Sequence, residues 1–550
     1  MNMKKIIILI LLSFPFFIEA QNGIQWQQRL GGIGTDQANC IIQTADSGYA
    51  VIGQTDSNDS VVYGNHGGND YLFYKLDKNG NQQWHRWYGS SADDIPTSII
   101  QTPDGGYLIA GLTWGNNGDV SGNHGEVDVW LIKTNGEGFI EWQKCYGGTG
   151  IDGLYSYSDY YYFTAPAAVS IINTIGGGYI FATSSNSNNG DVSGNHGGYD
   201  FWVVKLNDTG AIQWQNCYGG NQDDIVNSII QNGDGSYVIA GYTNSDSGQI
   251  SSPHTSCYVD PNWGLICTFD YLIIKIDNVG NLIWQKTYGG TNNDYATSIV
   301  SSHDGGYMVA GSATSADGDV TGLLGYQNYW LIKLDSSGNL QWEKCYGGNY
   351  GDVATSIINT NDGGYFVIGN SNSDSLEVTN HHDTSNYNVD VWAVKIDSTG
   401  TLLWENSFGG SLNDNASCVI KTLDGGFVIA GNTNSIDGDV IPDSAKIDFW
   451  IFKLGSNVGI NKIVNRNPSI LVYPNPFNNE CTIKISGVKS LSITLSIYNL
   501  LGDEEYSAIK SGNNISEFIL NRNQLPSGFY FYKLTDESKT VVASGKLIIE

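Results

Sequence analysis

Carboxylates recur at one position of a repeating sequence and are the first residues to weigh as a reactive or metal-binding set. Each aspartate lies six residues after an aromatic residue or, once, after a leucine: Asp36, Asp94, Asp152, Asp224, Asp294, Asp352 and Asp414. Hard cations such as Ca²⁺ prefer carboxylate ligands, so a ring of these residues is a candidate metal site. The alternative is that each carboxylate accepts backbone N–H bonds and fixes a turn. Presence in every repeat favours the turn, because a ligand site seldom needs seven copies.

Oxygen-rich loops and histidines offer a second set of metal ligands. Residues 117–125 (NGDVSGNHG) recur unchanged as residues 189–197, and residues 63–68 are similar. Such loops could hold Ca²⁺, but Asx-turns explain them equally well. His66, His124 and His196 come from different repeats, which argues against a shared zinc site.

Lysine also recurs once per repeat, at the end of a hydrophobic strand motif: Lys75, Lys133, Lys205, Lys275, Lys333, Lys395 and Lys453. We expect their stems to cover the neighbouring sheet and their ammonium groups to be paired at its edge. No nucleophile elbow, zinc-protease motif or comparable catalytic constellation occurs. The sequence therefore predicts no catalytic residue and no cofactor, with Ca²⁺ kept as a candidate ligand.

Aromatic residues gather in insertions that break the repeat. The candidates for ligand binding are Trp114, Tyr155, Tyr157, Tyr160, Tyr161, Tyr162, Tyr258 and Trp263. Loops on a rigid scaffold usually carry recognition, and an apolar patch with a polar rim suggests binding of a sugar or a protein. The alternative is that the tyrosines plug a central channel or cover the edge of the core.

Two of the eight cysteines, Cys257 and Cys267, lie ten residues apart within one such insertion. We predict a disulfide there, with two unpaired thiols as the alternative. Cys145, Cys217 and Cys345 share one repeat position, and Cys40 and Cys418 share another, as expected of small buried side chains.

Seven repeats must position these residues. A tryptophan segment recurs at Trp26, Trp84, Trp142, Trp214, Trp284, Trp342 and Trp404. Each repeat holds four short segments rich in β-branched and aromatic residues, bounded by Gly, Asn and Asp. Four antiparallel strands per unit indicate a propeller blade rather than a solenoid coil.

The order of the segments also predicts how the ring closes. The Ser-Ile-Ile type of strand is the most apolar and is placed innermost, with the tryptophan strand outermost. The first tryptophan strand has no inner strands before it, and the last repeat lacks one, so residues 24–30 should complete the last blade. The fold class is therefore all-β, with a seven-bladed propeller over residues 21–454, one face of tight turns and one face of longer loops.

The repeats resemble those of β-propeller proteins of bacterial cell surfaces, with Gly-Gly, Asp, an apolar strand and then Asp-Gly-Gly-Tyr. This resemblance covers residues 24–454 and is specific to fold. The rhythm of Lys-Leu-Asp followed by Gly and Trp is also similar to quinoprotein blades, but no quinone site is present.

Composition and the N-terminus predict export. Lys4 and Lys5 precede an apolar run that ends before Gln21, so residues 1–20 are predicted to be a signal peptide. No later run is long enough to span a membrane. With 26 basic against 55 acidic residues and a net charge of −29, the chain is not expected to bind nucleic acid.

After a linker over residues 455–467 the repeat gives way to alternating strands over residues 468–550, which predict a small antiparallel sandwich. This segment resembles the type A C-terminal sorting domain of the type IX secretion system of Bacteroidota. The landmarks that carry the resemblance are Pro474, Asn475, Pro476, Gly502, Pro526, Gly528, Tyr530 and Lys546. The resemblance implies passage across the outer membrane by the type IX machinery, and then surface attachment or release.

The leading functional hypothesis is a monomeric, non-catalytic propeller at the cell surface or outside the cell. It would bind a glycan or a protein through its loop-rich face. The alternative is an extracellular propeller enzyme, a hydrolase or lyase acting on polysaccharide, since two nearby carboxylates suit glycosidic bond cleavage.

Overall fold

The computed structural model describes residues 23–549, except 60, 155–168, 251–255, 261–263, 384–386, 444–445, 457, 459–468, 487–491, 500–501, 512–516, 523–524 and 537–540. The predicted signal peptide and most of the predicted linker lie outside the described residues. The chain divides into two compact units, residues 1–459 and residues 460–550.

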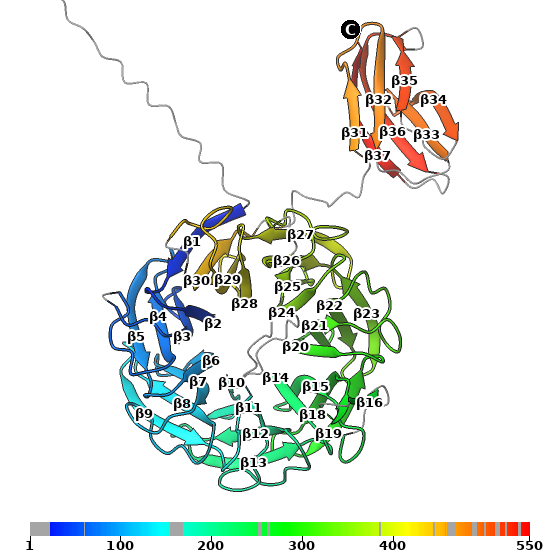
Figure 1. The fold of residues 1–550 in the computed structure, drawn as a ribbon. Coiled ribbons are helices and arrows are strands. Elements are labelled where there is room, and N and C mark those ends of the chain that lie inside the picture. The colour runs from blue at the N-terminus through cyan, green and yellow to red at the C-terminus, as the bar shows by residue number, and fades with distance from the viewer. Residues whose placement is uncertain are drawn as a thin grey trace, which may run out of the picture. The chain divides into compact units, whose positions relative to one another are not determined.

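Seven four-stranded antiparallel sheets form the described part of the first unit, arranged around a common axis (Figure 1). The innermost strands are β2 (Asp36–Gln43), β6 (Asp94–Gln101), β10 (Ser170–Asn173), β14 (Asp224–Gln231), β20 (Asp294–Ser301), β24 (Asp352–Asn359) and β28 (Asp414–Lys421). The second strands are β3 (Tyr49–Thr55), β7 (Tyr107–Thr113), β11 (Tyr179–Ser185), β15 (Tyr237–Thr243), β21 (Tyr307–Ala313), β25 (Tyr365–Ser371) and β29 (Phe427–Thr433). The predicted seven-bladed propeller is therefore confirmed.

The outer half of each blade completes the sheet. The third strands are β4 (Asp70–Leu76), β8 (Asp128–Thr134), β12 (Asp200–Leu206), β18 (Asp270–Ile276), β22 (Asn328–Leu334), β26 (Asp390–Ile396) and β30 (Asp448–Leu454). The outermost are β5 (Gln82–Tyr88), β9 (Ile140–Tyr146), β13 (Ile212–Tyr218), β19 (Leu282–Tyr288), β23 (Leu340–Tyr346), β27 (Leu402–Phe408) and β1 (Ile24–Leu30). Each outermost strand carries one of the seven tryptophans, as predicted.

The core lies between blades. The second strands are almost wholly buried and the third strands still more so, which explains their continuous apolar sequences. Trp130, Trp202, Trp330, Trp392 and Trp450 of the third strands are fully buried. The indole N–H of Trp130 donates to Gln143 of the outer strand at 2.8 Å, so the aromatic ring packs in the core with its polar atom satisfied.

The N-terminal strand β1 pairs with β30 and completes the seventh blade, as the repeat order predicts. Gln27 of β1 accepts the indole N–H of Trp450 at 2.9 Å, the role that Gln143 plays within blade two. Arg29 donates to Asp448 at 2.6 Å and to the carbonyl oxygens of Ser435 and Lys446. Both side chains of the Arg29–Asp448 pair are almost fully buried, so the closure is electrostatic as well as apolar.

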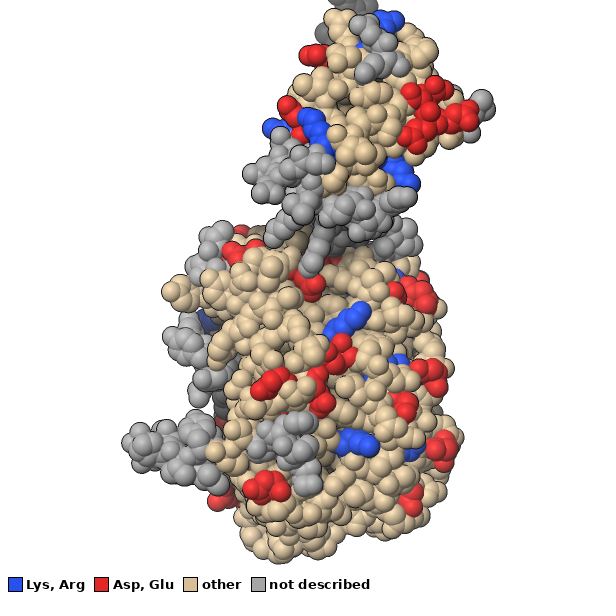
Figure 2. Space-filling view, turned by 90° about the vertical axis from the view of Figure 1, so that its right-hand side faces the viewer, with Lys and Arg blue, Asp and Glu red and all other residues tan. Residues whose placement is uncertain are grey.

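Charge on the outer surface is sparse. On the side of the propeller that Figure 2 shows, acidic side chains are scattered among mostly uncharged residues, with few basic ones. This agrees with a chain in which only 15% of residues are charged.

The second unit contains a three-stranded and a four-stranded sheet, the expected small sandwich. The first sheet is β31 (Ser469–Tyr473), β32 (Glu480–Ser486) and β35 (Glu517–Asn521). The second is β34 (Glu504–Ser511), β33 (Ser492–Tyr498), β36 (Gly528–Asp536) and β37 (Val541–Ile549). Alternating residues of both sheets form its core, with Ile483, Leu495 and Leu534 fully buried.

Arg29→Met should destabilise the propeller by about 3–5 kcal/mol, because it leaves the Asp448 carboxylate buried without its cation. Adding Asp448→Asn should restore part of the loss, since Asn328 occupies the equivalent position in blade five. Denaturant unfolding of the single and double variants measures both effects. A single variant as stable as the wild type would show that closure does not depend on this pair.

Candidate functional site

The seven repeated aspartates lie at the start of the inner strands, apart from blade three, and all are fully buried. Each accepts the backbone N–H of the residue four positions earlier at 2.6–2.9 Å; the donors are Gly32, Ser90, Gly148, Gly220, Gly290, Gly348 and Gly410. Serine hydroxyl groups add further bonds, such as Ser315 to Asp294 at 2.7 Å. These are the bonds that a turn-fixing role requires.

A second set of acidic residues lies against the first, one on each third strand except in blade five. The pairs join neighbouring blades: Asp448 with Asp36, Asp70 with Asp94, Asp128 with Asp152, Asp200 with Asp224, Asp270 with Asp294, and Asp390 with Asp414. Sequence reasoning assigned no role to this second set. The available signal was an acidic residue that opens six of the seven strongly apolar third strands.

In Tyr-Gly-Gly segments such as residues 146–148, 218–220 and 288–290, the first glycine lies where the two carboxyl groups converge. A Cβ atom on Gly219 would lie 2.4 Å from Asp200 Oδ1 and 2.7 Å from Asp224 Oδ2. Contacts this short do not occur in folded proteins, so any side chain would force the pair apart. The carboxylate pair thus explains why glycine recurs at this position.

Different partners compensate the charge of the second carboxyl group in different blades. The Nδ1 atoms of His66, His124 and His196 lie 2.8, 2.7 and 2.6 Å from the aspartate four residues later. His382 Nδ1 lies 2.8 Å from Asp390, and Arg29 serves Asp448. The histidines are thus engaged with carboxylates of their own blades.

Blade five has an amide in place of the second carboxyl group. Asn328 replaces the acid and its side-chain amide donates to Asp352 at 3.1 Å. The residue four positions earlier is Leu324 instead of histidine, and its N–H donates to Asn328 Oδ1 at 2.7 Å. Blade five therefore lacks both the acid and the histidine four residues earlier.

Burial raises the pKa values of several of these carboxyl groups. The pKa rises to about 6 for Asp70 and Asp94 and to about 7 for Asp224 and Asp414, with desolvation as the main cause. Hydrogen bonds from hydroxyl and backbone groups oppose this rise. Within the described residues no group of three His, Cys, Asp or Glu side chains is arranged to hold a metal ion.

Most of the repeated lysines lie at the opposite face and pair with aspartates of the tight turns. Lys133 Nζ lies 2.8 Å from Asp104, and Lys333 Nζ lies 2.7 Å from Asp304. Each lysine side chain is nearly buried while its aspartate is half-exposed, as expected for a stem that covers the sheet. Lys205 has no aspartate in its turn and donates to the Gly177 carbonyl oxygen at 2.9 Å.

The loop-rich face carries an aromatic cluster over blades three to five. Tyr242 contacts Phe269 and Tyr295, with ring centroids 5.2 and 5.0 Å apart, and both contacts are edge-to-face. Tyr199 and Leu154 pack against the same cluster. The equivalent positions in blades seven and one hold amides, including Asn415, Asn432, Gln37 and Gln54, so this end of the ring has an aromatic side and an amide side.

A pocket of about 350 Å³ adjoins this cluster on blade five. It lies between the loop that enters β20 and the loop that joins β21 to β22. Its lining includes Asn292, Asn293, Tyr295, Thr314, Leu323, Tyr326 and Gln327. The Thr314 hydroxyl group donates to the Asn293 carbonyl oxygen at 2.7 Å, so the two loops are tied together beside the pocket.

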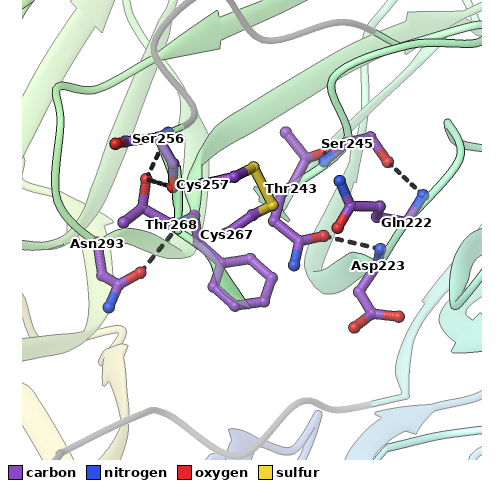
Figure 3. Close-up of a disulfide and its surroundings, with 11 residues drawn as sticks. Gln222, Asp223, Thr243, Ser245, Ser256, Cys257, Cys267, Thr268 and Asn293 are labelled. Carbon is purple, nitrogen blue, oxygen red and sulfur yellow. Dashed lines mark hydrogen bonds between the residues drawn. A yellow bond between two sulfur atoms is a disulfide. The ribbon is translucent and has the colours of Figure 1, made fainter. Parts of the chain in front are cut away.

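The disulfide loop of blade four begins next to this pocket. Cys257 and Cys267 are joined by a disulfide across a two-stranded ribbon, β16 (Cys257–Asp260) and β17 (Gly264–Cys267), as Figure 3 shows. At its base Phe269 N–H donates to Asn293 Oδ1 at 3.0 Å, which links the ribbon to the pocket wall.

Of the eight aromatic residues predicted to bind a ligand, the structure describes two. Trp114 is 38% exposed on a loop of blade two, and Tyr258 belongs to β16. Tyr155, Tyr157, Tyr160, Tyr161, Tyr162 and Trp263 lie outside the described residues. The insertion that holds the tyrosines starts within the inner strand of blade three, because Asp152 pairs with Ser185 and Ser170 with Ala182.

The expected sorting landmarks cluster at one end of the sandwich strands. Asn475 accepts the N–H of Ile548 and donates to the Lys546 carbonyl oxygen, both at 2.9 Å. The Tyr530 hydroxyl group donates to the Pro526 carbonyl oxygen at 3.0 Å. These bonds tie the segment before β32 to β37 and the Leu-Pro turn to β36.

Comparison with known proteins identifies the second unit. Residues 471–550 match the secretion system C-terminal sorting domain, which implies secretion by the type IX system to the cell surface or the extracellular space. The described residues contain no helix long and apolar enough to cross a membrane.

The propeller has more distant similarities. Regulatory protein FlaEY of Caulobacter vibrioides is 27% identical over 177 residues, which is 30% of this chain and 18% of that protein. PorZ, a surface component of the type IX system of Porphyromonas gingivalis, is 12% identical with a TM-score of 0.34, covering 91% of this chain and 58% of PorZ. The Pan2 WD40 domain of Neurospora crassa is 9% identical with a TM-score of 0.40, covering 80% and 96%.

The buried carboxyl pairs predict that the propeller loses stability as pH rises. The pKa values of Asp70, Asp94, Asp224 and Asp414 in the folded chain lie above the ordinary 3.8, so between pH 4 and 7 the folded state holds protons that the unfolded state has lost. That stabilisation is complete below pH 4 and disappears as pH passes through about 6–7. The melting temperature should therefore fall between pH 5 and 8.

Asp70→Asn should make the fall in melting temperature smaller. It removes one carboxyl group with a raised pKa and also removes that group's repulsion of Asp94. Asp77→Asn is the matched control, since Asp77 lies in an exposed turn and its hydrogen bonds with Asn81 lower its pKa. Melting curves at several pH values test the expectation. A flat or rising profile for the wild type would contradict it.

Proposed function

We propose that this propeller is a non-catalytic binding module that is displayed at the cell surface or released outside the cell. It binds its ligand at the loop-rich face. One observation carries the proposal: an aromatic cluster and a pocket adjoin on one side of an otherwise repetitive scaffold. Recognition sites commonly lie on such loops, positioned by rigid strands.

The chemistry of the pocket favours a neutral glycan over a protein. Its walls combine amides, a hydroxyl group and two tyrosines, and none of the described residues that line it is charged. Amides and hydroxyl groups can exchange hydrogen bonds with sugar hydroxyls, while a tyrosine ring offers a flat apolar surface for the face of a sugar ring. The net charge of −29 disfavours glycans rich in uronic or sialic acids.

The alternative, an enzyme acting on polysaccharide, would require two carboxyl groups that reach the substrate. The inter-blade pairs are buried on both sides by backbone and neighbouring strands. They therefore support the blade interfaces and lend no weight to the enzyme.

Export supports the same proposal. We propose that the predicted signal peptide over residues 1–20 directs the chain to the periplasm and that residues 468–550 direct it across the outer membrane. In this scheme residues 21–454 are the displayed module.

Tyr326→Ala should weaken glycan binding at least fivefold, because loss of one aromatic contact costs about 1 kcal/mol. Tyr326 is 56% exposed, so its removal should leave the melting temperature unchanged. Tyr387→Ala, on the corresponding loop of blade six and 77% exposed, is the matched control.

The measurement is binding of the secreted chain to an array of neutral and uronic-acid-containing oligosaccharides, followed by titration calorimetry on the best neutral one. Equal affinities for wild type and Tyr326→Ala would reject the pocket. Binding of a purified surface protein, with no glycan bound, would redirect the proposal to a protein ligand.

Deleting residues 468–550 should leave the protein in the periplasm, because the segment recognised by the secretion machinery is lost. Cell fractionation with an antibody against the propeller measures this. Wild-type levels of the truncated chain in the medium or on the surface would contradict it.

A further inference from the structure

The thiols of Cys40 and Cys418 lie next to each other at the closure of the ring. Their sulfur atoms are 3.9 Å apart although the residues are separated by 378 positions in the chain. Cys40 belongs to β2 of blade one and Cys418 to β28 of blade seven, which become neighbours only when the ring closes.

At one position of the inner strand, cysteine occurs only in the two blades that meet where the ring closes. One residue of each inner strand occupies the same place in the repeat: Cys40, Ser98, Ser170, Ser228, Ser298, Ser356 and Cys418. Four of these five serine hydroxyl groups accept an N–H from the next blade, as Ser298 does from Ile357 at 3.3 Å. The two blades that adjoin across the closure both have cysteine instead.

We propose that Cys40 and Cys418 form a second disulfide during export, joining the inner strands of the first and last blades. The protein is secreted, and disulfides persist in the compartments that secreted proteins enter. Closing the bond requires the sulfur atoms to approach by about 2 Å, to the usual S–S length of about 2.05 Å.

The reaction is an exchange with an external disulfide, carried by a thiol oxidoreductase or a small disulfide such as oxidised glutathione. The Cys40 thiolate attacks one sulfur of the oxidant and releases the other as a thiol. The Cys418 thiolate then attacks Cys40 Sγ, forming the new bond and releasing the second oxidant thiol. Two cysteines are oxidised by two electrons, the oxidant disulfide is reduced by two, and the two thiol protons end on the oxidant.

The surroundings of the two cysteines favour Cys40 as the first thiolate to attack. The Cys418 thiol donates to the Cys40 sulfur, and this hydrogen bond lowers the pKa of Cys40 and so favours its thiolate. By contrast, burial raises the pKa of Cys145 and Cys345 on the outer strands to about 12, which keeps those thiols unreactive.

Such a bond changes what holds the ring together. Without it, the closure depends on the pairing of β1 with β30, on the Arg29–Asp448 ion pair and on the apolar packing of blade one against blade seven. A Cys40–Cys418 bond would keep blades one and seven together even when β1 separates from β30. Because it closes a loop of hundreds of residues, it should strongly restrict the unfolded chain.

Peptide mapping of the secreted full chain tests the proposal. Free thiols are blocked with N-ethylmaleimide under denaturing conditions without reductant, and we expect a peptide linking Cys40 to Cys418 in the wild type. Cys145→Ser should leave that link in place. Complete alkylation of Cys40 and Cys418 in the secreted chain would overturn the proposal.

A second measurement separates this bond from Cys257–Cys267. Reductant should lower the melting temperature of the wild type by several degrees more than that of Cys40→Ser/Cys418→Ser, in which only Cys257–Cys267 can be reduced. Serine occupies this position in the other five blades, so the double variant should fold. Equal shifts in the two proteins would also overturn the proposal.

Discussion

The packing of two acidic side chains at six of the seven blade interfaces determines the local structure of much of this propeller. One carboxyl group fixes the turn into the inner strand by accepting an N–H bond, and the other opens the third strand of the preceding blade. Bringing them together requires a glycine between them and a means of offsetting buried charge. Raised pKa values, histidine, arginine and, once, an asparagine supply that offset, so the same geometry recurs with different chemistry around the ring.

Much of the fold could be predicted because its repeat is visible along the chain. The repeated segments predict the order of the strands and place the tryptophan strand outermost. The first tryptophan strand has no inner strands before it and the last repeat lacks one, which predicts closure by residues 24–30. The structure confirms these predictions. The acid pairs could not be predicted in the same way. Asp70 and Asp94 belong to different blades, and only the closed ring shows that neighbouring third and first strands meet there. The same holds for Cys40 and Cys418, whose contact is absent from any local pattern.

The candidate site lies in blade five, where the sequence departs from the repeat. In blade five, Leu323 and Leu324 replace the Asn-His of other loops, and Asn328 replaces the acid beneath them. The exchange removes charge from the interface and places apolar side chains beside the pocket. The sequence showed the aromatic insertions of blades three and four, but the pocket depends on Tyr295 and Tyr326, which belong to ordinary repeat segments and became visible only in three dimensions.

The N-terminal strand β1 forms the outer strand of blade seven, and this affects how the domain folds during its synthesis. Residues 24–30 leave the ribosome early, whereas their partners at residues 448–454 leave more than four hundred residues later. Until then the nascent chain presents an unpaired strand edge at each end, and such edges invite pairing with other chains. A propeller built this way cannot finish blade by blade as a solenoid can; its last step is a contact between the oldest and the youngest parts of the domain.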